Sequence, residues 1–128
     1  MKDLIFVGST KEDLSIFPPE VKRVLGFALR AAQRGGKHPD AKPLKGFTGA
    51  TVLEVVEDFD GDTYRAVYTV RFSTAVYALH VFQKKSKRGI ETARQDVELI
   101  KQRLKWAEQI HRQLLARAES DATEGQKR

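Results

Sequence analysis

Apolar and polar residues follow two different periods along this chain, and the changes between them outline its elements. The first clear helical pattern lies near the N-terminus, with apolar residues at 21, 24, 25, 28, 29 and 32. This three-to-four-residue spacing predicts an amphipathic helix over about 19–34, which Pro18-Pro19 can start and Gly35-Gly36 can end. A β-prone run at 3–7 and a capping sequence at Ser9 predict a strand and a brief helical turn before it.

The middle of the chain contains three β-rich runs, at 52–57, 64–71 and 76–83. Asp60-Gly61 separates the first two, and this dipeptide is a strong signal for a tight hairpin turn. The pattern therefore predicts an antiparallel meander of three strands. The preceding segment, 37–50, is rich in proline, glycine and lysine, so we expect it to be a surface loop.

After Gly89 the period changes back to that of a helix. One apolar stripe contains Val97, Ile100, Leu104, Ala107, Ile110 and Leu114. This stripe predicts a long C-terminal helix. The apolar periodicity is lost from Ala118 onwards, so we expect one domain over 1–117 and a disordered tail over 118–128. The order β-α-β-β-β-α indicates the α+β class.

Composition limits the cellular location and the kinds of site that we expect. The chain has 128 residues, which suits a single domain, and it has no cysteine, which excludes disulfides and thiolate metal sites. Its three histidines, at 38, 80 and 111, are too far apart in sequence to suggest a zinc site, so we expect no metal and no cofactor. The longest apolar runs are far shorter than a membrane span or a signal peptide core, which predicts a cytoplasmic protein that does not contact membranes.

The net charge of +6 predicts a polyanion or an acidic protein surface as the partner. Four cations fall within five residues where the last predicted strand ends: Lys84, Lys85, Lys87 and Arg88. Such a cluster is either a solvated turn or a surface that binds phosphates. We also single out Tyr68, which can stack on an unpaired base or belong to the core.

Arg65 is the unusual residue of the predicted strands. Strand alternation places it on one face with Val67, Thr69 and Arg71. A charge inside a strand needs either a solvent-filled groove or a carboxylate partner, and Glu54 and Glu57 on the neighbouring strand are the candidates.

These residue types can cleave RNA without a metal, because the 2′-hydroxyl of RNA can attack the adjacent phosphate. The protein must then supply a proton acceptor, a proton donor and positive charge for the developing phosphorane. An arginine such as Arg65 can clamp the phosphate, and a lysine crowded by other cations, such as Lys84 or Lys85, holds its proton less tightly. His80 is the conventional acid–base candidate, or else a residue buried within the sheet.

Four sequence segments, taken in order, carry a family resemblance. They are Lys42-Pro43-Leu44-Lys45-Gly46, Tyr64-Arg65-Ala66-Val67-Tyr68, Tyr77-Ala78-Leu79-His80-Val81-Phe82-Gln83-Lys84-Lys85-Ser86 and the closing Ile-Lys-Gln-Arg-Leu helix. Over roughly residues 2–110 the chain resembles the HigB-like, phage-related branch of the RelE/ParE toxin superfamily. The individual motifs are short, so the resemblance depends on their order and spacing.

The resemblance implies a RelE-like microbial ribonuclease fold, with an antiparallel sheet, N-terminal helices and a long C-terminal helix. It also implies a toxin of a type II toxin–antitoxin system that cleaves mRNA, usually on the ribosome. The expected partner is a cognate antitoxin, typically a helix-turn-helix protein, and operator DNA is contacted only through that antitoxin.

The resemblance also assigns site residues. Arg65 resembles the strand arginine that contacts the scissile phosphate, and Lys84 and Lys85 resemble the basic pair at the end of the last strand. We therefore expect Arg65, Lys84, Lys85 and His80 to be catalytic. Residues expected to bind RNA are Lys42, Lys45, Lys87, Arg88 and Tyr68.

One departure leaves the proton acceptor open. No tyrosine follows the basic pair as it does in the best-known RelE proteins, so Lys84, Lys85 and His80 stay as alternatives. Two other functions also stay open: a ParE-like gyrase inhibitor on the same fold, and a nucleic-acid-binding protein of phage origin that breaks no bond.

Overall fold

A computed structural model describes residues 1–84 and 93–126 of the chain, and its side chains as far as Thr123. The elements in chain order are β1 (Asp3–Phe6), α1 (Thr10–Ser15), α2 (Pro19–Gln33), β2 (Lys42–Pro43), the 3-10 turn η1 (Thr48–Ala50), β3 (Val52–Phe59), β4 (Asp62–Thr69), β5 (Ala75–Lys84) and α3 (Arg94–Gln126). This order confirms the α+β class and the N-terminal and C-terminal helices.

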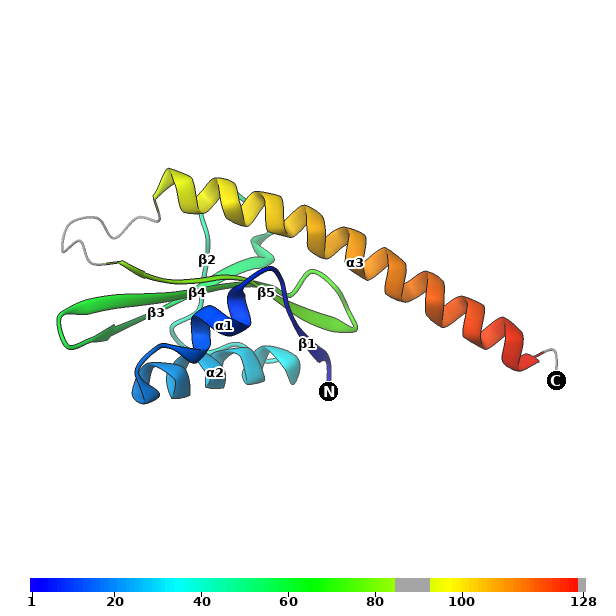
Figure 1. Cartoon of the computed structure of the whole chain (residues 1–128), viewed down its shortest axis with the longest axis horizontal. Helices are drawn as coiled ribbons and strands as arrows, with labels where there is room; N and C mark the ends of the chain where they lie inside the picture. Colours follow the sequence, from blue (N-terminus) through cyan, green and yellow to red (C-terminus); the bar gives the residue numbers. More distant parts are fainter. Residues whose placement is uncertain (85–92, 127–128) are drawn as a thin grey trace.

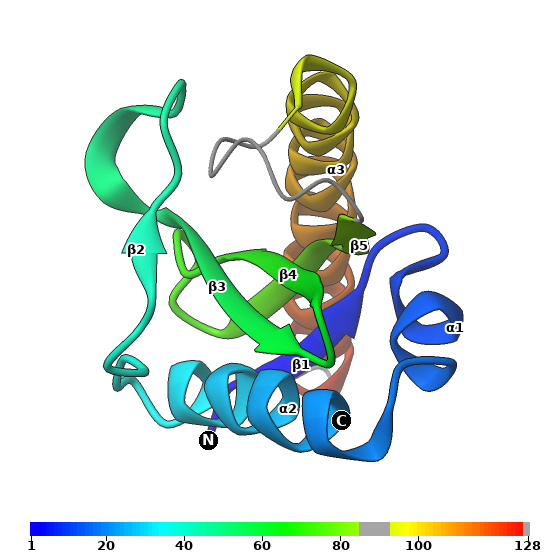
Figure 2. The ribbon, with the colours of Figure 1, turned by 90° about the vertical axis from the view of Figure 1, so that its left-hand side faces the viewer.

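The strands form one sheet in the order β1-β5-β4-β3-β2. Helix α2 lies under one face of this sheet, and α3 runs across the other (Figures 1 and 2). The predicted meander of three antiparallel strands is confirmed as β3, β4 and β5, and the whole sheet is mixed because β1 pairs in parallel with β5, with Leu4 opposite Val76. Hydrophobic patterning indicates a strand but carries no information about its direction.

The β3–β4 hairpin confirms the turn read from the sequence. Its register runs from Val52 opposite Thr69 to Phe59 opposite Asp62, so only Asp60 and Gly61 form the loop. Both have positive φ, 52° and 83°, as a tight hairpin turn of this kind requires. The predicted surface loop needs one correction, because Lys42 and Pro43 form the short edge strand β2 against β3.

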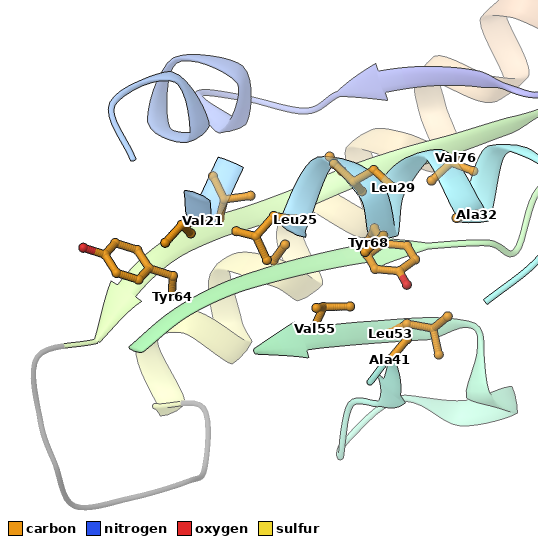
Figure 3. Close-up of a cluster of buried hydrophobic side chains, with 14 of the residues drawn as sticks. Val21, Leu25, Leu29, Ala32, Ala41, Leu53, Val55, Tyr64, Tyr68 and Val76 are labelled. Atoms are coloured by element: carbon orange, nitrogen blue, oxygen red, sulfur yellow. The ribbon is translucent and has the colours of Figure 1, made fainter. Parts of the chain in front are cut away.

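Each face of the sheet buries its own apolar cluster. The cluster under α2 includes Leu25 and Leu29 of the helix and Val55 and Tyr68 of the strands, all essentially inaccessible to solvent (Figure 3). The cluster under α3 includes Val52, Val67 and Tyr77 of the strands and Ile100 and Ala107 of the helix. The site described below lies on the α3 side.

Only the first half of α3 packs on the sheet. Ile100, Arg103 and Ala107 are buried, whereas every side chain from Arg112 to Thr123 is exposed, including Leu114 of the predicted apolar stripe. The helix continues beyond the sheet (Figure 1) and through the segment that we expected to be a tail, as far as Gln126. The domain boundary at 117 stays a prediction. In the described part of the chain, no helix combines the length and the apolar character needed to cross a membrane.

Candidate functional site

Arg65 occupies the α3-facing side of β4, where it is buried and paired with a carboxylate. Its side chain is 2% exposed, and its Nη1 donates a hydrogen bond to Glu54 Oε1 at 3.0 Å. Glu54 lies diagonally across on β3, where Val56 is the direct partner of Arg65. Of the two carboxylates that the sequence offered, the structure thus pairs Arg65 with Glu54. A buried guanidinium needs such a partner, since an isolated buried charge costs several kcal/mol.

Lys42 lies beside this ion pair. The β2–β3 register places Lys42 directly opposite Glu54, and residues paired in this way project from the same face of a sheet. Lys42 is exposed, and Lys45, which follows β2, is exposed as well. The short strand that the sequence did not reveal therefore brings a lysine next to the Arg65–Glu54 pair.

His80 lies on the same face, in β5, opposite Val67 of β4. Its Nε2 is 2.8 Å from Asp96 Oδ1, and its Nδ1 is 3.5 Å from a guanidinium nitrogen of Arg103. Its ring stacks on Phe82 with the ring centroids 4.3 Å apart. Phe82 is in turn the β5 partner of Arg65, so His80 and Arg65 are neighbours across one aromatic ring.

The surroundings of His80 favour its neutral form. Burial lowers the pKa of His80 and the positive charge of Arg103 lowers it further, although the hydrogen bond and charge of Asp96 act in the opposite direction. Because Arg103 can only donate, the hydrogen-bond network assigns the ring proton to Nε2, which donates to Asp96. Both ring nitrogens are therefore engaged, and His80 connects β5 to α3.

Arg103 is a central residue of this face that sequence reasoning missed. Its guanidinium donates to the carbonyl oxygen of Leu79 at 3.0 Å and to Ser9 Oγ at 3.2 Å. The latter hydroxyl donates to Asp13 Oδ2 at 2.8 Å. Burial lowers the pKa of Arg103 below that of a solvated arginine. This one side chain thus ties α3 to β5 and to the start of α1.

Gly8 gives Arg103 the space that it occupies. Its φ is +60°, and a Cβ at this position would lie 3.0 Å from Arg103 Nε. Any other residue would therefore be strained and would also press on the guanidinium. Arg103 had a signal in the sequence, because it is a cation in the middle of the apolar stripe, three residues after Ile100 and four before Ala107.

The remaining predicted site residues divide into three groups. Lys84 ends β5 and faces the same side as Arg65, two residues beyond Phe82. Lys85, Lys87 and Arg88 lie outside the described residues. Tyr68 lies on the opposite face, fully buried under α2, and burial raises its pKa to about 12. Tyr68 belongs to the core on the face opposite to Arg65, so we remove Tyr68 from the site.

The site therefore consists of charged groups on one sheet face: Arg65 and Glu54 at its centre, Lys42 and Lys84 beside them, and the Asp96–His80–Arg103 network under α3. Cations gathered on one surface can bind phosphates and stabilise added negative charge on them. Among the residues that the structure describes, no group of histidine, aspartate or glutamate side chains is placed to hold a metal ion.

Comparison with known families gives one match. Residues 12–105 match the family described as "Phage derived protein Gp49-like (DUF891)". The match extends from α1 into α3 and includes Arg65, His80 and Arg103. Comparisons with curated proteins and with solved structures give no match. Because the match covers most of the sequence, the chain belongs to the Gp49-like family of phage-derived proteins, a RelE-like toxin family of type II toxin–antitoxin systems.

Proposed function

We propose that this chain is a HigB-like toxin that acts in the cytoplasm as a metal-independent mRNA endoribonuclease on translated message. The observation that carries the proposal is the position of the buried Arg65, whose guanidinium pairs with Glu54 beside Lys42. A cation that is already in place needs no reorganisation when negative charge develops on a phosphate. Membership of a RelE-like toxin family supports the same function.

In the proposed reaction, the 2′-oxygen attacks the adjacent phosphorus and the bond to the 5′-oxygen breaks. The products are a 2′,3′-cyclic phosphate and a new 5′-hydroxyl. Arg65 stabilises the phosphorane, while Lys42, Lys45 and Lys84 bind the phosphates nearby. The candidates for the proton transfers are Lys84, Lys85 and His80; the ring nitrogens of His80 contact Asp96 and Arg103.

The antitoxin is the proposed protein partner. The family implies such a partner, and the net charge of +6 favours one that brings an acidic surface to the site. We expect a helix-turn-helix protein, so that operator DNA is reached only through the antitoxin.

A second candidate is binding of nucleic acid without cleavage. Its support is that Arg65 and His80, two of the proposed catalytic residues, are each engaged with a carboxylate. On this alternative the cations hold phosphates, and no group moves a proton.

The test is to induce the chain in a bacterial host and map new 5′ ends on translated messages by primer extension. We compare the wild type with Arg65→Ala, with Arg65→Lys and with the matched control Arg23→Ala. Arg23 is an exposed cation of α2, on the other side of the sheet. We expect cuts inside reading frames for the wild type and for Arg23→Ala, and their loss in Arg65→Ala.

Arg65→Lys keeps a positive charge next to Glu54, so it distinguishes a loss of catalysis from a loss of folding. A lysine lacks the planar fork of arginine, so we expect a folded protein whose cleavage is at least about tenfold weaker. Cuts that persist in Arg65→Ala would show that the site is elsewhere. Growth arrest without cuts would favour a target such as gyrase, and RNA binding without arrest or cuts would favour the second candidate.

A further inference from the structure

A groove with a volume of about 780 Å³ lies on the same side of the sheet as Arg65. One wall is α3, and the other is the segment from Gly46 to Thr51, which follows β2 and includes η1. In Figure 2 this segment and α3 both lie on the upper side of β3, apart from each other. A cavity of this size is in the range that accommodates a small organic ligand, or about one or two nucleotides.

The α3 wall presents a row of charges with its cations in the middle. Glu98, Lys101, Lys105 and Glu108 line the groove at helical spacing, and thus share one face of the helix. Glu108 accepts a hydrogen bond from Arg71 across the groove. Lys101 is 3.9 Å from Glu98, a loose contact, and within the described residues Lys105 has no carboxylate within salt-bridge distance. The centre of this wall is therefore cationic.

The opposite wall combines bare backbone with an aromatic ring. Gly46 and Gly49 both have positive φ, and a Cβ at either position would meet no atom within 4 Å. Polypeptide without side chains lets another polymer come close. Phe47, between them, is half-buried, packs against the α3-side core and also lines the groove. Its ring can offer a face to an unpaired base.

The groove leads towards Arg65. Val52 lies at its floor, and Glu54, which holds Arg65, is two residues further along β3 on the same face. Two residues of a strand span about 7 Å. Arg65 is in register with Val56, four residues from Val52, so a chain held at Arg65 reaches the groove within about two nucleotides.

We propose that this groove binds unpaired RNA next to the phosphate held at Arg65, with Lys101 and Lys105 on successive phosphates and Phe47 under a base. The inference rests on the proposed function and adds the residues that hold the flanking nucleotides. The two lysines are one helical turn apart, about 6 Å along the axis, which suits neighbouring phosphates of one strand. An aromatic ring beside cations favours single-stranded nucleic acid over an acidic peptide, which has no base to stack.

The experiment measures binding of the purified full chain to a fluorescein-labelled 2′-O-methyl RNA of eight nucleotides, which cannot be cleaved by 2′-hydroxyl attack. Fluorescence anisotropy is recorded over a range of salt concentrations for the wild type and for Lys101→Ala/Lys105→Ala. The matched control is Arg112→Ala/Arg117→Ala, which removes two exposed cations of the same helix beyond the groove. Phe47→Leu tests stacking while keeping an apolar side chain.

We expect the lysine double variant to bind at least about tenfold more weakly, with the slope of log Kd against log salt smaller by about 1.4, since each phosphate contact to a single strand contributes about 0.7. Phe47→Leu should weaken binding without changing the slope, and the arginine control should bind like the wild type. Melting curves for all variants confirm that they are folded.

Wild-type affinity and slope in the lysine double variant would overturn the inference, even if Arg65-dependent cleavage stands. The inference would also be overturned if the lysine double variant bound RNA like the wild type but no longer bound a labelled glutamate-rich peptide. That result would assign the groove to an acidic protein. If the wild type makes no cuts but its RNA binding depends on the two lysines, the proposed function fails and the groove assignment holds.

Discussion

Tyr68 shows at the scale of one residue how burial decides what a side chain can do. The sequence offers it as a surface for a base, but it lies under α2 with its hydroxyl buried and without a hydrogen-bond partner among the described residues. Burying an unsatisfied hydroxyl costs about 1–3 kcal/mol. Tyr68 is thus a core residue that carries a destabilising polar atom.

Removing that atom should stabilise the protein. We expect Tyr68→Phe to raise the free energy of unfolding by about 1 kcal/mol and to leave RNA binding unchanged. Urea denaturation measures the first effect, and the anisotropy assay measures the second. A loss of stability of similar size would mean that the hydroxyl has a partner after all.

His80 makes stability depend on pH. Burial lowers its pKa in the folded state, so the unfolded chain takes up a proton more readily below the ordinary value of about 6.5. The stability contribution of neutral His80 is therefore complete above this pH and is lost as pH falls below it. We expect the urea midpoint of the wild type to drop between about pH 7.5 and pH 5.5.

The variant His80→Gln should reduce this dependence, because glutamine does not titrate. His38→Gln should keep it, since His38 lies in the loop after α2, away from the Asp96–His80–Arg103 network. An equal drop in all three proteins would assign the dependence to other groups.

At the scale of elements, the sequence predicted what depends on local pattern. The amphipathic α2, the three long strands and the Asp60-Gly61 turn each carry their signal within a few residues. The short β2 was missed, because two residues, one of them proline, cannot show a period of two. The parallel pairing of β1 was missed because direction is decided by the rest of the sheet.

For the candidate site as well, the sequence predicted only the residues that have a local signal. Arg65 stood out as a charge inside a strand, and the structure selects Glu54 from its two possible partners. Asp96 and Arg103 belong to the site only because α3 crosses β5, a contact between distant parts of the chain. Tertiary packing, rather than local sequence, assembles that network.

We expect the exposed C-terminal part of α3 to be dispensable for folding, and the part that packs on the sheet to be required. The side chains from Arg112 to Thr123 are exposed, so a chain that ends after Arg117 should keep its free energy of unfolding within about 0.5 kcal/mol and should still cleave RNA. A chain that ends after Lys105 loses buried Ala107 and the 3.1 Å contact between Tyr77 and His111, and should lose about 2 kcal/mol or more. Equal loss in both truncations would show that the outer half of the helix has a packing role.

For the whole molecule, net charge should control how fast the antitoxin binds. If the proposed antitoxin carries an acidic surface, long-range attraction to the net charge of +6 on this chain accelerates encounter, and salt screens that attraction. We expect the association rate constant to fall at least about tenfold between about 0.05 M and 0.5 M NaCl, with a much smaller change in the dissociation rate. Stopped-flow mixing with the antitoxin measures both, and an association rate indifferent to salt would contradict the electrostatic explanation.

The parallel pairing of β1 with β5 affects the order in which the strands of a nascent chain can pair. Asp3 leaves the ribosome early, but its partner Ala75 emerges only after α1, α2 and the β3–β4 hairpin have been made. Until then the first strand has no sheet to join, and β5, once made, has an uncovered edge until β1 docks. The sheet is therefore completed only when β1 pairs with β5, the strand that lies farthest from it in the sequence.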